Sequence, residues 1–192
     1  SGGDRAGLSE EFRSLVGSYL RGERAREELA SGLTEYVLSG PKQYLPYRML
    51  VELRLAGGDA DGALSVYDDA VSVLDGDPRP AQDAAMLLLS LARYEQAARM
   101  ARLWAQRDPR AEQEAQLAEA TALAGTGETS RALALFDQQR ERLVDNPRRF
   151  AGELIAYAGA LASLERVESL RNLIADRTTE TPIWAAAALE AA

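Results

Sequence analysis

Cysteine and histidine are both absent from this chain of 192 residues. Without cysteine no disulfide framework can form, and without either residue there is no thiolate or imidazole ligand for zinc. A nucleophile–imidazole pair is also excluded, and the commonest general base is missing. We therefore predict a protein that is not an enzyme and that holds no metal ion and no cofactor.

Long apolar runs and an excess of positive charge are missing as well. No apolar stretch approaches the length of a membrane-spanning helix, so we expect no direct membrane insertion of this segment. The net charge is −8, from 22 Lys and Arg against 30 Asp and Glu. Binding to a phosphate backbone needs a dense Lys and Arg footprint, so we expect no nucleic-acid partner.

Pairs of adjacent carboxylates do occur, at Glu10–Glu11, Glu27–Glu28 and Asp68–Asp69. Adjacent residues on a helix do not face each other, so such a pair cannot flank one scissile bond. The segment Asp59-Ala60-Asp61-Gly62 has part of the spacing of a calcium loop, but Ala70 stands where the loop needs its last Glu. A solvated helix face and a turn are the better interpretations.

A helical pattern that repeats is the main positive signal. Apolar residues recur at helical spacing throughout, and no stretch alternates as a strand does. One position recurs at a pitch of 34 or 35 residues, at Phe12, Tyr47, Ala81, Ala115, Phe150 and Trp184. A proline follows each of the first five, at Pro41, Pro78, Pro109, Pro147 and Pro182. Such a period is typical of a helix–turn–helix solenoid, which presents an extended binding surface.

The repeat predicts one domain over residues 9–192, after a start at 1–8 that looks like a tag remnant. The expected units are about 9–41, 42–78, 79–109, 110–147 and 148–180, each with two helices, and a half unit 181–192. Residues 183–192 would form an eleventh helix. Because Trp184 continues the internal pattern, we expect a longer array cut at this point. An unfinished terminal repeat leaves an apolar face that would allow a homodimer.

These residues resemble the tetratricopeptide repeat (TPR). Its first helix carries a large residue, Leu-Gly and Tyr at fixed spacing, and its second carries Ala with an aromatic four residues later. The matches are Phe12, Leu15 and Tyr19; Phe150 and Tyr157; Ala63 and Tyr67; Ala97 and Ala101; and Ala132 and Phe136. The glycine position departs from the pattern, with Val16, Val51, Ala85, Glu119, Leu154 and Ala188. The resemblance implies an all-α, TPR-like α-solenoid, a right-handed superhelix of about eleven antiparallel helices.

In that family the first helix of each pair lines the concave, ligand-binding side. Carried over position by position, the resemblance gives a protein-binding surface of Arg13, Arg48, Met49, Glu52, Gln82, Asp83, Met86, Leu89, Gln116 and Leu117. Within it, the hydrophobic members Met49, Met86, Leu89 and Leu117 would form an apolar strip for a helix or an extended segment. The alternative is that they pack on the neighbouring unit as core.

Some family members bind the terminal carboxylate of a chaperone with a clamp that contains asparagine. The only asparagines in this chain are Asn146 and Asn172, and neither belongs to this surface. We therefore expect no role as a chaperone co-factor. The segment from Asp77 to Pro109 is similar to TPR-rich envelope proteins of Gram-negative bacteria. We therefore expect a scaffold or adaptor for protein partners, part of a larger bacterial envelope protein of the protease-adaptor or assembly type, in the periplasm rather than the cytoplasm. The alternatives are a periplasmic scaffold of exopolysaccharide export, and a structural or regulatory arm of a larger enzyme.

Overall fold

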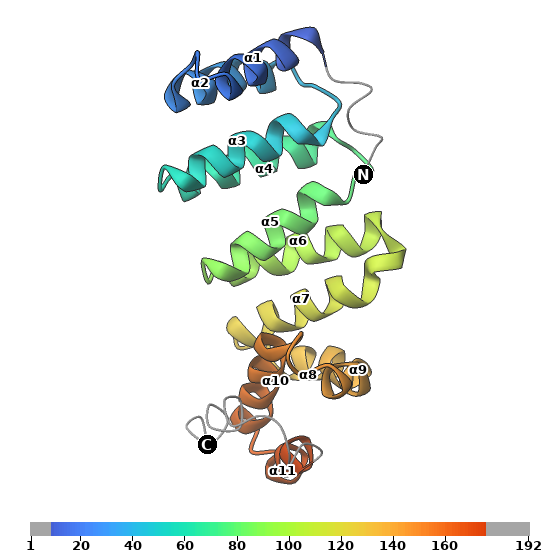
Figure 1. Ribbon diagram of the computed structural model, residues 1–192. Helices are drawn as coiled ribbons and strands as arrows, with labels where there is room; N and C mark the ends of the chain where they lie inside the picture. Colours follow the sequence, from blue (N-terminus) through green and yellow to red (C-terminus); the bar gives the residue numbers. More distant parts are fainter. Residues whose placement is uncertain (1–8, 176–192) are drawn as a thin grey trace. The chain divides into compact units, whose positions relative to one another are not determined.

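The computed structural model describes residues 9–175, and all regular structure in that range is helical (Figure 1). The described part contains eleven α-helices and one short 3-10 helix, η1. In chain order they are α1 (Glu10–Leu20), α2 (Arg26–Leu38), α3 (Tyr44–Ala56), α4 (Ala60–Val73), α5 (Arg79–Ser90), α6 (Tyr94–Arg107), η1 (Pro109–Ala111), α7 (Glu112–Gly125), α8 (Thr129–Gln138), α9 (Arg140–Asp145), α10 (Ala151–Ser163) and α11 (Val167–Ala175). The predicted all-α class is confirmed for this range.

Two compact units make up the chain, Ser1–Ala84 and Ala85–Ala192. The division falls inside α5, so no linker separates them. It also falls inside the third predicted repeat rather than at a predicted boundary. The units are described one at a time below.

The first unit is built from helix hairpins. Helix α1 packs on α2, and α3 packs on both α2 and α4. Ala63 and Ala70 are fully buried on α4, and such small side chains let this helix lie close to its neighbours. Tyr47 of α3 is fully buried as well. The rings of Phe12 and Tyr36 meet at 5.6 Å between centroids and hold α1 to α2.

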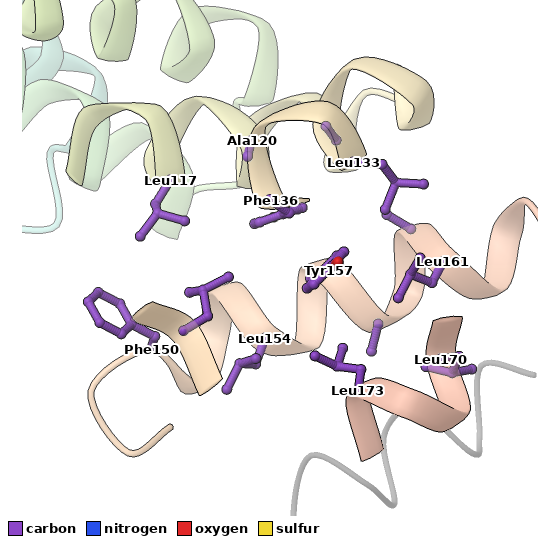
Figure 2. Packing of buried hydrophobic residues seen from close by; sticks show 14 of the residues in the cluster. Leu117, Ala120, Leu133, Phe136, Phe150, Leu154, Tyr157, Leu161, Leu170 and Leu173 are labelled. Atoms are coloured by element: carbon purple, nitrogen blue, oxygen red, sulfur yellow. The ribbon is translucent and has the colours of Figure 1, made fainter. Parts of the chain in front are cut away.

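A core cluster of the second unit lies around α10 (Figure 2). Helix α10 packs on α7, α8 and α11, so its buried residues Leu154, Tyr157 and Leu161 meet side chains from all three. The stacked rings of Phe136 and Tyr157 lie 5.2 Å apart and join α8 to α10. Aromatic pairs of this kind stabilise a core beyond the area they bury.

The same turn follows the first helix in all five described helix pairs. In each, one residue has a left-handed backbone, namely Gly22, Gly58, Ala92, Gly127 and Glu165. That residue donates its N–H to the carbonyl three positions earlier, and the next residue donates to the carbonyl five positions earlier. In the second pair these bonds are Gly58 to Leu55 and Asp59 to Arg54, both 2.9 Å. This is the Schellman motif, which satisfies the last carbonyls of a helix.

The predicted repeat positions are core positions wherever the structure describes them. Phe12, Tyr47, Ala81, Ala115 and Phe150 are all at most 5% exposed. The helices α1, α3, α5 and α7 begin at intervals of 34, 35 and 33 residues. Trp184, the initial residues 1–8 and the half unit 181–192 lie outside the described residues.

The second helix expected in the fourth unit is interrupted, which the sequence interpretation did not foresee. Its segment forms α8 and α9, separated at Gln139. The Gln139 side chain is buried and its amide donates to Oε1 of Gln116 on α7 at 3.1 Å, while its backbone leaves helical geometry. The eleventh described helix arises from this interruption, whereas the one expected at 183–192 lies outside the described residues.

Candidate functional site

The ten residues predicted to form a binding surface divide between the two units. In the first unit, Arg13, Arg48 and Glu52 are exposed, and Met49, Gln82 and Asp83 are half-buried. In the second unit, Met86 is 52% exposed, Leu89 and Gln116 are half-buried, and Leu117 is buried.

Leu117 does not belong to an exposed apolar strip. It is only 2% exposed and lies in the core cluster of the second unit, where Figure 2 shows it pointing toward the side chains of α10. For this residue the alternative interpretation as core is the correct one, because an apolar stripe on an amphipathic helix is normally turned inward. Met86 is the member of the proposed strip that is well exposed.

A hollow of about 230 Å³ lies in the first unit between α3 and the start of α5. Its lining consists of Tyr44, Leu45, Arg48, Arg79, Gln82 and Asp83, and we call it the α3–α5 hollow. Three of the predicted residues, Arg48, Gln82 and Asp83, are brought together here. Tyr44, Leu45 and Arg79 were missed, although Tyr44 and Arg48 are four residues apart and therefore share a helix face.

The start of α5 positions one side of the hollow. Asp77 accepts the backbone N–H of Arg79 at 3.0 Å, and its carboxylate also binds the guanidinium of Arg79 at 2.7 Å. Pro80 occupies the first turn, where a residue without an N–H costs the helix nothing. Gln82 and Asp83 follow on this turn and face the hollow.

Tyr44 contacts two other residues of the lining, Asp83 and Arg79. Its side chain is buried at 3% exposure, and its hydroxyl donates to Oδ2 of Asp83 at 2.5 Å. The guanidinium carbon of Arg79 lies 5.2 Å from the centroid of its ring, a cation–π contact. Burial, followed by the bond to Asp83, raises the pKa of Tyr44 well above its ordinary value. The hydroxyl therefore stays protonated and keeps Asp83 in place.

Tyr67 of α4 interacts with Tyr44. Burial raises the pKa of Tyr67 to about 12, and the carboxylate of Asp83 adds to the effect. Both hydroxyls are protonated at physiological pH, as an ordinary tyrosine also is. On the open side, Nε of Arg48 donates to Oε1 of Glu52 at 3.0 Å, one helical turn further along α3.

The α3–α5 hollow is lined mainly by charged and polar side chains. It offers two guanidinium groups, one carboxylate and one amide, but no nucleophile beside a base. Within residues 9–175, no group of three or more acidic side chains is placed to hold a metal ion. The guanidinium, carboxylate and amide groups of the hollow can form hydrogen bonds and ion pairs.

The second unit has a groove of about 400 Å³ whose lining is uncharged. It is lined by Tyr94, Thr121, Ala124, Gly125, Gly127, Thr129, Ala156, Gly159, Ala160 and Ser163. The ring of Tyr94 lies against Gly125, where an added Cβ would be only 2.5 Å from Cγ of the tyrosine. At Gly159, by contrast, an added Cβ would meet nothing within 4 Å. The small residues Ala156, Gly159 and Ala160 of α10 indicate this groove in the sequence, although it was not among the predicted sites.

Ion pairs connect the helices around this groove. Glu119 of α7, at the position where the TPR pattern has glycine, binds Arg102 of α6 at 2.9 Å and lies 3.8 Å from Arg131 of α8. A second pair joins Glu114 to Arg142, and this hydrogen bond holds the pKa of the Glu114 carboxyl below its usual range. These contacts fix the spacing of neighbouring helices rather than forming a catalytic group.

No family model matches this chain, and no curated protein matches it either. Within the part of the chain that the structure describes, no helix is both long and apolar enough to cross a membrane.

Proposed function

We propose that this chain is a non-catalytic, TPR-like repeat scaffold that binds segments of partner proteins. The recurrence of helix starts, of buried positions and of one turn motif supports the repeat assignment. Repeat arrays of paired helices bury one set of positions between units and leave another set for binding. The exposed side chains of the first helices are the set that remains for a partner.

The observation that carries the proposal is the composition of the α3–α5 hollow. Arg48, Gln82 and Asp83 occupy repeat positions assigned to the binding surface, and all three line one hollow. Arg48 is exposed and Gln82 is half-buried, whereas Asp83 is also bound to the buried Tyr44. Charged groups at a protein interface contribute to specificity and to the rate of association.

The finer form of the proposal places the scaffold in a larger bacterial envelope protein of the protease-adaptor or assembly type. The resemblance of the segment from Asp77 to Pro109 to envelope TPR proteins, which covers about one repeat, motivates this form. A periplasmic scaffold of exopolysaccharide export and a repeat arm of a larger enzyme are the other candidates. Detection of the chain in periplasmic or cytoplasmic fractions of its native host, with a fraction marker, tests the compartment.

Site-specific photo-crosslinking in the native host tests the scaffold function. A benzophenone amino acid replaces Leu45 in the hollow, and Ser72, exposed on α4, serves as the matched position outside it. We expect one partner protein to be captured from position 45 but not from position 72. Excess unlabelled wild-type chain should abolish the adduct, whereas the Arg48→Gln chain should compete less well. Equal capture at both positions, or none at either, would overturn the proposal.

A further inference from the structure

We propose that the uncharged groove of the second unit binds the indole side chain of Trp184, supplied by the chain's own segment 181–189. We call it the α7–α10 groove, because these two helices supply most of its lining. The inference does not depend on the proposed scaffold function, whose site lies in the first unit. It goes beyond that function by naming the occupant of a second surface.

The lining of the groove favours an uncharged occupant. None of its ten residues carries a charge, although charged residues make up 27% of the chain. The hydroxyls of Thr121, Ser163 and Thr129 already donate to nearby main-chain carbonyls, at 2.9, 3.0 and 3.3 Å. A charged ligand would lose its hydration here without gaining a donor from these hydroxyls, whereas an apolar side chain gains by leaving water.

The size and the walls of the groove suit a large aromatic ring. Its volume of about 400 Å³ lies in the range of sites for small molecules, so a methyl group would leave most of it empty. The ring of Tyr94 belongs to the lining and lies against Gly125, and aromatic rings pair favourably with one another. Beside Gly159 of α10 there is open space, since an added Cβ would meet nothing within 4 Å.

Trp184 matches the groove in its chemistry. This residue lies outside the described part of the chain, so the match is argued from its sequence. It is the only aromatic residue after Tyr157, and it belongs to a stretch of nine residues, 181–189, that carries no charge. Four alanines, 185–188, follow it directly. Small side chains let a segment approach a surface of glycine and alanine closely, so these neighbours do not obstruct the indole.

The connection from α11 to Trp184 is long enough to reach the groove. Helix α11 packs on α10 and ends at Ala175, and Trp184 follows nine residues later. Nine residues span up to about 30 Å, whereas the 13 residues of α10 rise only about 20 Å. A tethered group within reach has an effective concentration on the order of millimolar, which favours it over the same side chain on a separate protein. While the indole is bound, the groove is closed to other polypeptides.

Fluorine NMR of the full chain labelled with 5-fluorotryptophan tests the inference. The chain contains two tryptophans, and Trp104 of α6 is only 4% exposed, so its signal is an internal reference for a shielded ring. The signal that disappears in Trp184→Phe is that of Trp184. We expect a soluble paramagnetic agent to broaden the Trp184 signal as little as that of Trp104, and this protection should persist on dilution.

Variants that fill the groove show where the indole binds. Gly159→Leu places a side chain in the open space and should release the indole, so that the agent broadens the Trp184 signal several-fold more. Gly152→Leu is the matched control on the same helix, because an added Cβ there also meets nothing within 4 Å but Gly152 is not part of the lining. Ser163→Leu fills the groove from a second lining residue and should act as Gly159→Leu does. Circular dichroism and the urea midpoint check the fold of each variant.

Release by both groove variants but not by the control supports the inference. A Trp184 signal that is already fully broadened in the wild type, or equal release by Gly152→Leu, would overturn it. Protection that survives both groove variants would place the indole elsewhere and would overturn it too. Protection that disappears on dilution would mean that a second copy supplies the indole, which removes the assignment to the chain's own segment. Photo-crosslinking at position 45 is independent of these results, so the two proposals can fail separately.

Discussion

Replacement of Ala92 by glycine is predicted to stabilise the second unit. Ala92 has φ of 54° and occupies the place in the Schellman turn that glycine takes in three of the five described hairpins. Its side chain is exposed, so the substitution removes no packing. Any change in stability therefore reports on the backbone alone.

The magnitude follows from two opposing terms. A residue with a Cβ pays roughly 1–2 kcal/mol for a left-handed conformation, and glycine does not. Glycine also makes the unfolded chain more flexible, which costs roughly 0.4–1 kcal/mol. Midway values leave a net gain of about 0.8 kcal/mol in the free energy of unfolding for Ala92→Gly. For a chain of this size such a gain raises the melting temperature by about 2–3 °C.

Urea unfolding followed by circular dichroism measures the effect, with the slope of the transition checked for constancy. Ala134 is the matched control, because it is an exposed alanine inside α8 and the same substitution there should cost about 1 kcal/mol. The two variants thus share their chemistry and differ in sign. A loss of stability in Ala92→Gly as large as that in Ala134→Gly would refute the assignment of this turn.

Three further predictions concern stability. Tyr47→Phe should leave the urea midpoint unchanged or raise stability by up to about 1 kcal/mol, because its buried hydroxyl has no hydrogen-bond partner among residues 9–175; a clear loss would reveal one. Gly125→Ala should cost about 1–3 kcal/mol by overpacking against an aromatic ring, whereas Gly159→Ala should gain up to about 1 kcal/mol in thermal unfolding; equal effects would contradict the described groove. The carboxyl of Glu114 has a lowered pKa because Arg142 binds it, so its contribution is present above the unfolded value of 4.5 and is lost as pH falls through the folded pKa. Glu114→Gln should therefore weaken the decline of the urea midpoint on acidification below that value, and an unchanged pH profile would exclude this ion pair as a cause.

The helix pairs were predictable because their signals are local. The repeat period and the glycines at 22, 58 and 127 mark the turns directly. Ala92 and Glu165 adopt the same turn without a glycine, so the packing of the flanking helices imposes it there. The break at Gln139 was not predictable, because neither proline nor glycine marks it and its partner Gln116 lies on another helix.

The candidate site was only partly predictable for a related reason. Arg48 and Asp83 follow from their repeat positions on the first helices. The role of Tyr44 depends on a hydrogen bond to Asp83 that spans 39 residues, and no local pattern signals such a contact. Leu117 was predicted to belong to the binding surface because of its repeat position, but it belongs to the core of the second unit.

Glu119 makes its predicted repeat unlike the others, and this difference limits how the helices could be reordered along the chain. It occupies a position that other units fill with a small or apolar residue, and it meets Arg102 and Arg131 on the two adjoining helices. Moving α7 to another place in the helix order would leave this largely buried carboxylate without its cations, which is unfavourable. The order of α6, α7 and α8 is thus encoded by charge as well as by apolar packing, so these helices are not exchangeable with one another.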